Sequence, residues 1–288
     1  MNNYILSNER LKVKISLPGI EYRGSRFDWM GMITDVVLDN KDKFCSKESL
    51  IEGEGTDGKG LYNEFGIEEP IGYEDAAIGD EFPKIGVGLL KKESSKAYDF
   101  FHQYSINEFK NEVKVEDDNI TFICNPKETR GYEIKYIKKI SIKENELIVD
   151  YTIENLGKRA INTTEYCHNF ILINDKLVGN DYLLRFSYPV EMDNKPEILD
   201  INNNEIMFNQ EVKDVFYCRL KNFSKERGQY FELIHKASGV GVRESSDFNI
   251  ERVAIWGMEH VISPEVFVNV NINPGESQSW KRTYKFFN

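Results

Sequence analysis

The chain has 288 residues, a formal net charge of −11, and 40% hydrophobic and 12% aromatic residues. Binding to a nucleic-acid backbone needs clustered Lys and Arg, so this acidic composition argues against such a partner. No apolar run reaches the roughly 18 residues of a membrane span, and residues Met1 to Lys14 lack the apolar core of a signal peptide. We therefore expect a cytoplasmic protein without membrane association that buries a sizeable hydrophobic core.

The four cysteines are scattered and form no C-x-x-C pair: they are Cys45, Cys124, Cys167 and Cys218. This spacing favours reduced thiols over a disulfide framework or a zinc site. No His-x-His pair or carboxylate cluster has metal-ligand spacing either. We expect no bound metal.

Strand-like and loop-like segments follow one another in the first half of the chain. Residues Leu11–Leu17 alternate between apolar and polar side chains, as a strand with one buried face does. Residues Ile51–Gly88 hold nine of the twenty glycines and many acids, so we expect loops without regular strands there. Because apolar side chains are interleaved with these glycines, the segment is predicted to be an ordered lip of a cleft.

Alternation returns from Gly131 to Gly157, where it predicts a hairpin that turns at Glu144–Glu146. The last forty residues predict strands over Val253–Ile262, Val266–Ile272 and Ser279–Phe287, the last two joined by a turn at Asn273–Pro274–Gly275. A helix of three turns is hard to find. The pattern predicts a single all-β domain over residues 1–288, a mostly antiparallel sandwich or barrel with little helix.

His168 stands in a strand-like run from Asn162 to Ile173. Alternation places Thr164, Tyr166, His168 and Phe170 on one face of that strand. Sugars bind to such faces, because their C–H groups stack on aromatic rings while their hydroxyls need directed donors and acceptors. Tyr166 and His168 are therefore candidate binding residues, although a half-buried structural histidine would look the same.

The sequence resembles the aldose 1-epimerase (galactose mutarotase-like) superfamily, in particular its compact bacterial members. The resemblance rests on three stretches: Asn162, Thr164, His168 and Phe170; Gly19–Ile33, which includes Tyr22–Trp29; and Pro274–Glu276 with Trp280 and Tyr284–Phe286. It implies a β-supersandwich fold and cofactor-free interconversion of sugar anomers. In that reaction a carboxylate takes the proton of the anomeric hydroxyl and a histidine protonates the ring oxygen, from opposite sides of the anomeric carbon.

The resemblance makes His168 the candidate acid, acting as an imidazolium. For the base it implies a glutamate shortly before the closing hairpin, and Glu265 and Glu259 both qualify. We favour Glu265, because Pro264 is expected to end a strand and place Glu265 at the strand mouth.

The superfamily's second histidine is missing, and Lys84 stands in its expected region. Lys84 is therefore a candidate donor to a sugar oxygen, and His102 is a further substitute; His235 and His260 match no motif. Arg23 and Arg26 are candidate substrate ligands, and their spacing lets at most one of them face a cleft if the segment is a strand.

Three functions remain in competition. The first is anomer interconversion of a sugar or sugar phosphate. The second is a non-catalytic carbohydrate-binding or sensing domain that kept the cleft without the second histidine. The third is lyase or hydrolase chemistry, which expects paired carboxylates or a tyrosine base. The sequence leaves the oligomeric state open.

Overall fold

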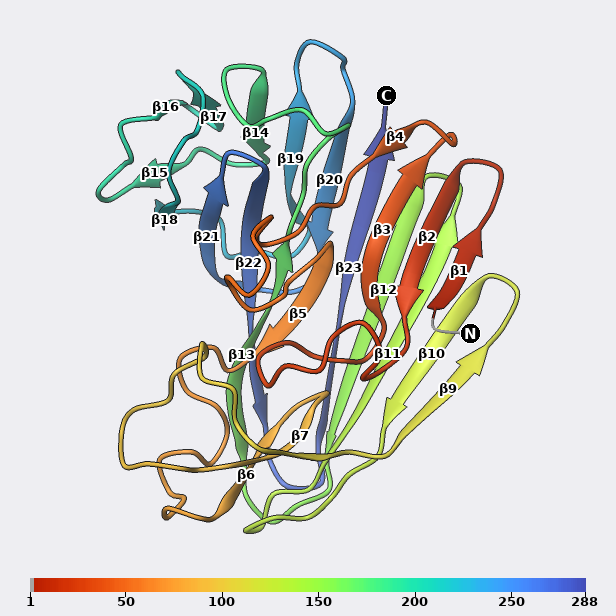
Figure 1. Ribbon diagram of the computed structural model, residues 1–288, viewed down its shortest axis with the longest axis vertical. Coiled ribbons are helices and arrows are strands. Elements are labelled where there is room, and N and C mark those ends of the chain that lie inside the picture. The colour runs from red at the N-terminus through yellow and green to blue at the C-terminus, as the bar shows by residue number, and fades with distance from the viewer. Residues whose placement is uncertain (1–2) are drawn as a thin grey trace.

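The computed structural model describes residues 3–288, which form strands and loops and contain no helix. The strand pairs in this range are antiparallel. Two ten-stranded sheets and one three-stranded sheet account for the strands (Figure 1). The expected all-β, antiparallel architecture is confirmed. The described residues contain no helix that could cross a membrane.

The first large sheet carries both chain-terminal and central segments. Its strands in spatial order are β1 (Asn3–Ser7), β2 (Leu11–Ser16), β3 (Met32–Leu38), β5 (Leu61–Phe65), β13 (Ile161–Asn169), β22 (Val261–Ile272), β21 (Ile250–Met258), β18 (Phe216–Asn222) and β15 (Glu191–Met192), with β4 (Asp42–Lys43) paired to β3.

The second large sheet contains the long hairpins. Its strands in spatial order are β16 (Leu199–Asn202), β17 (Glu205–Phe208), β14 (Tyr182–Phe186), β19 (Gln229–His235), β20 (Gly241–Ser246), β23 (Ser277–Phe287), β12 (Glu146–Asn155), β11 (Ile134–Lys143), β10 (Asn119–Cys124) and β9 (Asn111–Val115). The small sheet consists of β6 (Glu81–Lys84), β7 (Gly88–Lys91) and β8 (Ile106–Glu108).

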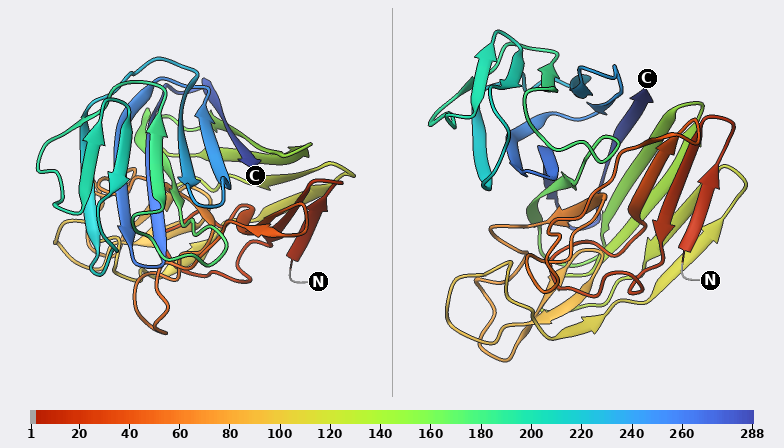
Figure 2. Two further views of the ribbon diagram at one scale, coloured as in Figure 1. Left: turned by 90° about the horizontal axis from the view of Figure 1, so that it is seen from above. Right: turned by 45° about the horizontal axis from the view of Figure 1, so that its top comes forward.

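The two large sheets pack face to face. The right panel of Figure 2 shows β1–β3 lying over β9–β12, and a Cβ on Gly31 would collide with Phe122 of β10 and Ile140 of β11. Along β12 every second side chain is buried, which is the alternation that predicted the hairpin. The large sheets thus enclose the core, while β6 and β7 lie at the end of the molecule opposite the C-terminus (Figure 1).

The predicted break at Pro264 is wrong, because β22 runs unbroken from Val261 to Ile272. The chain turns earlier, between Met258 and Val261. Proline interrupts a strand only where its missing N–H is needed by a neighbour. The ladder with β13 ends at Phe267, so Pro264 lies beyond it, and its carbonyl instead accepts a bond from Asn169 Nδ2 at 2.6 Å.

The segment Ile51–Gly88 is mostly loop, as expected, but it also contains the strands β5 and β6. All five residues of β5 are buried. A strand covered on both faces shows no alternation, which explains why the sequence pattern missed it.

Candidate active site

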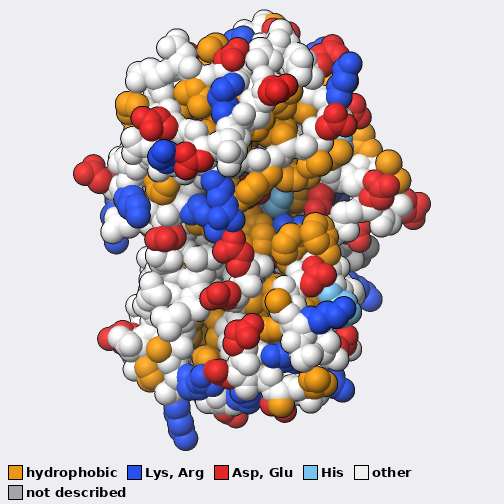
Figure 3. Space-filling view, turned by 90° about the vertical axis from the view of Figure 1, so that its left-hand side faces the viewer, with side chains coloured by type: hydrophobic (Ala, Val, Ile, Leu, Met, Phe, Trp, Pro, Cys, Tyr) orange, Lys and Arg blue, Asp and Glu red, His pale blue; other side chains and the backbone are white. Residues whose placement is uncertain are grey.

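The outer face of β13, β21 and β22 forms the floor of a cleft with a volume of about 340 Å³. Figure 3 shows hydrophobic side chains gathered around this hollow, with a histidine inside it. The polar lining includes Arg26, Glu48, Tyr166, His168 and Glu265, and the apolar lining includes Ile67, Phe101, Val215, Tyr217, Trp256 and Met258. Small-molecule sites commonly combine such an apolar wall with a few convergent polar groups.

Cross-strand register brings His168 and Glu265 together. Tyr166 lies opposite Phe267 and Ile171 lies opposite Ile262, so the same register places His168 opposite Glu265. Directly opposed residues on one sheet face have Cβ atoms about 5 Å apart. His168 Nε2 and Glu265 Oε1 are accordingly 3.3 Å apart.

Aromatic rings hold the imidazole of His168. It stacks on Phe170 with ring centroids 3.9 Å apart, and the indole of Trp256 meets it edge-on at 5.2 Å. The Nδ1 atom has no hydrogen-bond partner among the described residues. Burial lowers the pKa of His168 well below its usual value, and the nearby charge of Arg26 lowers it further.

Burial acts on Glu265 in the opposite direction. It raises the pKa of the carboxyl to about 8, although Arg26 and a bond from Ser263 Oγ at 3.3 Å oppose the rise. Burial therefore disfavours the charged form of both groups, so Glu265 is the member of the pair that holds a proton more tightly. This differs from the imidazolium expected for His168, because both groups are withdrawn from water and Arg26 disfavours a second positive charge.

Arg26 is fixed at the edge of the cleft by acids and rings. Its Nε donates to Glu64 Oε2 at 2.9 Å, and its Nη1 donates to Glu48 Oε1 at 3.3 Å. Its guanidinium lies 4.5 Å from the ring centroids of Phe27 and Phe100. Its one positive charge is thus paired with two carboxylates, and the two rings restrict its position.

The fold has counterparts among solved structures. The chain matches a galactose mutarotase related enzyme from Lactobacillus acidophilus with a TM-score of 0.63 at 14% identity, covering 99% of this chain and 97% of that one. It matches a galactose mutarotase-like protein from Lactobacillus casei with a TM-score of 0.60 at 14% identity, covering 99% and 100%. The chain has the galactose mutarotase-like fold.

A third match is the aldose epimerase homologue from C. elegans, with a TM-score of 0.61 at 9% identity, covering 99% of this chain and 98% of that one. A scan of family models and a search of curated proteins gave no match. The likeness to the galactose mutarotase-like structures therefore lies in the fold, and the resemblance found in the sequence is confirmed at that level.

Within this fold, Tyr166 lines the cleft, but its hydroxyl is engaged by protein groups. It donates to Glu64 Oε2 at 2.6 Å and accepts from Arg26 Nη2 at 3.2 Å. Its ring stacks on Phe267 at 4.4 Å. Tyr166 thus contributes part of the cleft wall, while its hydroxyl holds Glu64 and Arg26 in place.

Lys84 does not reach the cleft, contrary to its prediction as a substrate ligand. Its side chain is 1% exposed, and Nζ donates to the carbonyl of Phe65 at 2.7 Å and lies 3.6 Å from Glu64 Oε1. Burial lowers its pKa to about 8. Lys84 therefore pairs with Glu64 outside the cleft lining and does not replace the missing histidine in the cleft.

The two arginines take different positions, but not for the predicted reason. The segment from Leu17 to Gly31 is a loop, so strand alternation does not apply to it. Arg26 lines the cleft, whereas Arg23 is exposed outside it and donates from Nε to the carbonyl of Gly19 at 2.7 Å.

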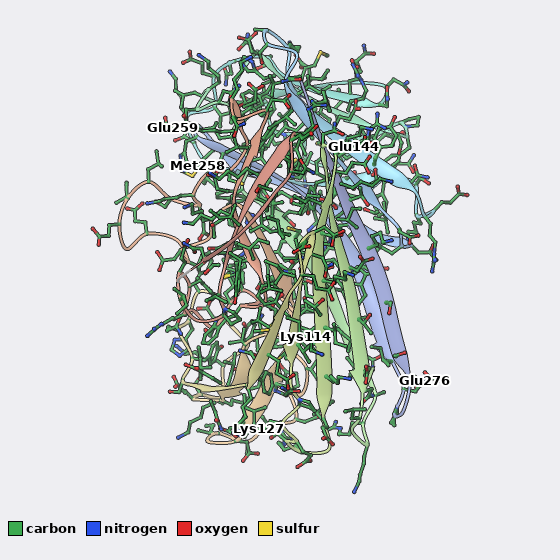
Figure 4. The ribbon with its side chains drawn as sticks, turned by 90° about the vertical axis from the view of Figure 1, so that its right-hand side faces the viewer. Lys114, Lys127, Glu144, Met258, Glu259 and Glu276 are labelled. Atoms are coloured by element: carbon green, nitrogen blue, oxygen red, sulfur yellow. The ribbon has the colours of Figure 1, made fainter. Side chains whose placement is uncertain are left out.

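The alternative base and the other histidines lie away from the cleft lining. Glu259 is exposed in the turn after β21, and Figure 4 shows it with Met258 at the periphery of the molecule. His102 is exposed and bonds Glu93 at 2.8 Å. His235 bonds Ser238 at 2.9 Å, and His260 is buried in the β21–β22 turn.

Sequence reasoning missed Glu64, Glu48 and Trp256. Glu64 gave only a weak signal, because it stands with Asn63 between the apolar residues Leu61–Tyr62 and Phe65, and its burial is visible only in the structure. Glu48 and Trp256 had no such signal, since only the fold brings their segments to the cleft.

Proposed function

We propose that the protein interconverts the anomers of a reducing sugar in this cleft, an aldose 1-epimerase activity. The observation that carries the proposal is the contact of His168 Nε2 with Glu265 Oε1, 3.3 Å apart, at the floor of the cleft. The galactose mutarotase-like fold supports it.

The proposed chemistry needs an acid and a base close together. The anomeric hydroxyl and the ring oxygen are both bonded to the anomeric carbon, so the groups that serve them must converge on one small region. An acid and a base on opposite sides of the ring, as expected from the sequence, do not match the contact between His168 and Glu265. The adjacent pair fits two oxygens on one carbon better.

The single proton on the pair sets the direction of the proposed transfer. Glu265 gives its proton to the ring oxygen as the bond from that oxygen to the anomeric carbon breaks. His168 Nε2 takes the proton of the anomeric hydroxyl, whose oxygen becomes the aldehyde carbonyl. Rotation about the next carbon–carbon bond turns the carbonyl, and closure reverses both transfers on its other face, restoring the neutral pair.

The apolar wall suits the rest of the sugar. Trp256, Tyr217 and Phe101 bring aromatic rings to the cleft, and the C–H faces of a pyranose stack on such rings. Arg26 and Glu48 provide a donor and an acceptor beside the floor. The cleft volume lies in the range of ordinary small-molecule sites.

A non-catalytic sugar-binding domain is the second candidate. The position of Lys84 favours this candidate, because Lys84 does not line the cleft. Among the described lining residues, Arg26 is then the one Lys or Arg, and its charge is already paired with Glu48 and Glu64. On this alternative, the cleft binds sugar without exchange of anomers.

NMR exchange spectroscopy separates the two candidates. Free and phosphorylated aldoses are tested with the wild-type protein and with His168→Ala in the same buffer, because buffer ions also catalyse mutarotation. We expect exchange above the buffer rate for at least one sugar with the wild type only. Sugar binding by calorimetry without added exchange would support the binding domain instead.

A further inference from the structure

A second hollow adjoins the cleft and has nearly the same size. Its volume is about 330 Å³, compared with about 340 Å³ for the cleft. Arg26, Gly55, Phe100 and Phe101 line both. The two hollows therefore meet along a ridge made by these four residues.

The ridge contains a glycine and two aromatic rings. Gly55 has a φ of +74° and carries no side chain, and a Cβ there would lie 3.0 Å from the carboxyl of Glu48. Phe101 is 64% exposed, which is unusual for so large an apolar ring. A ligand that crosses the ridge would cover this ring.

The far hollow offers polar groups that suit hydroxyls. Asp57 and Arg23 line it and are exposed. Within residues 3–288, no hydrogen bond or ion pair engages the Asp57 carboxylate, and the one bond of the Arg23 side chain is from Nε to Gly19. A carboxylate accepts from vicinal hydroxyls and a guanidinium donates to them. Because the opposite charges of Asp57 and Arg23 offset each other, the hollow favours a neutral polar ligand over a phosphate.

We infer that this hollow is a second sugar subsite and that the preferred ligand is a reducing disaccharide or the reducing end of a longer chain. The inference rests on the proposed function for its orientation, with the reducing unit at His168 and Glu265. In a 1→4-linked disaccharide the link leaves the reducing unit from the carbon across the ring from the anomeric carbon. The second unit then extends away from the acid–base pair, over Phe101 and toward Arg23.

Calorimetry and NMR exchange test the inference with galactose, glucose, lactose, maltose and glucose 6-phosphate. We expect lactose or maltose to bind about tenfold tighter than its own reducing-end sugar, glucose. Arg23→Ala combined with Asp57→Asn should remove that gain and leave the affinity and exchange rate of glucose unchanged. Arg227→Ala combined with Asp117→Asn is the matched control, since both residues are exposed and line neither hollow.

Each outcome separates this inference from the proposed function. Equal affinity for mono- and disaccharides, a preference for glucose 6-phosphate, or an equal loss for all sugars in the double variant would overturn the subsite. Exchange of a monosaccharide under those results would leave the proposed function standing. A disaccharide gain that the double variant removes, without exchange of any sugar, would support the subsite and refute the epimerase.

Discussion

Burial of Glu265 beside His168 changes the proton affinity of both side chains. Out of water the charged form of each group is disfavoured, so the pKa of the carboxyl rises while that of the imidazole falls. The pKa of the glutamate thereby lies above that of the histidine, the reverse of the order in the free amino acids. The pair thus places a proton donor, Glu265, beside a proton acceptor, His168, and acid–base catalysis needs both.

Substitution of either member should abolish most of the exchange. We expect His168→Ala and Glu265→Gln each to lower the anomer-exchange rate by ~10²–10⁴, the usual contribution of a positioned acid or base. The double variant should lose less than the sum of the single free-energy losses, because the two act on one transition state. NMR exchange measures the rates, and circular dichroism checks the fold.

Glu259→Gln is the control for these variants, because Glu259 is exposed outside the cleft lining. Its activity should equal that of the wild type. A folded His168→Ala protein with full activity would refute the role of His168.

The pH profile of the activity should follow the single proton of the pair. Glu265, with its pKa of about 8, loses that proton as the pH rises through this value, so kcat/KM should fall above about pH 8. His168 gains a second proton only well below its usual pKa, so no loss is expected on the way from pH 8 down to 6.5. Anomer-exchange rates, corrected for catalysis by the buffer, measure this profile. A rate that falls from pH 8 to pH 6.5 would contradict the assignment of Glu265 as the acid and His168 as the base.

At the residue scale, the sequence could nominate single side chains as candidates, but it could not predict which side chains they contact. His168 became a candidate through its strand face and the family resemblance, and Glu265 through the resemblance, and the structure brings the two together. Glu64 bonds Tyr166 across 102 positions of the chain. Local patterns do not encode the register of strands so far apart, so neither this pairing nor the burial of Lys84 behind it was predictable.

Among the elements, local hairpins were predictable and long-range pairings were not. The β11–β12 hairpin follows directly from alternation and a turn at Glu144. The pairing of β13 with β5 and β22 joins segments about 100 residues apart, which no local pattern reveals. The floor of the cleft consists of such pairings, and this is why the sequence indicated the site without its geometry.

The loop between β4 and β5 forms part of the cleft wall and is tied to it by Glu48. Glu48 Oε2 accepts bonds from the backbone N–H of Thr56 at 2.6 Å and of Gly58 at 3.1 Å. Its other oxygen accepts from Arg26. One carboxylate therefore joins the loop to the guanidinium that lines both hollows.

Removal of that carboxylate should loosen the loop. We expect Glu48→Ala to be cleaved faster by a broad-specificity protease between Leu50 and Gly60, and to bind sugar more weakly, because the loop loses its N–H acceptors. Bound sugar should slow the cleavage of the wild type. Timed digestion followed by mass spectrometry measures both effects.

Glu52→Ala is the matched control, since Glu52 is an exposed acid of the same loop. It should be cleaved at the wild-type rate. Equal digestion of the two variants would show that Glu48 does not hold the loop. A wild-type loop that sugar does not protect would show that the loop is not part of the binding site.

At the scale of the whole molecule, the two large sheets are joined by buried charges as well as by apolar packing. Arg282 of β23 contacts Glu165 of β13 and Glu244 of β20, each at 2.7 Å, and all three side chains are fully buried. Composition predicted a large hydrophobic core and gave no sign of these ions. Since β13 also carries His168 on its other face, the ion network fixes the strand that bears one member of the candidate acid–base pair.

Breaking this network should destabilise the whole fold. Arg282→Met leaves two carboxylates in the core without their cation, and loss of one partner of a buried ion pair costs about 3–5 kcal/mol. Urea unfolding followed by tryptophan fluorescence should show that loss. The control is Lys281→Met on the same strand: Lys281 pairs with Asp150 at 3.3 Å with both side chains more than 40% exposed, so its loss should change the free energy of unfolding by only about 0–1 kcal/mol. Equal stability of the two variants would mean that apolar packing alone holds the sheets together and that the buried ions are dispensable.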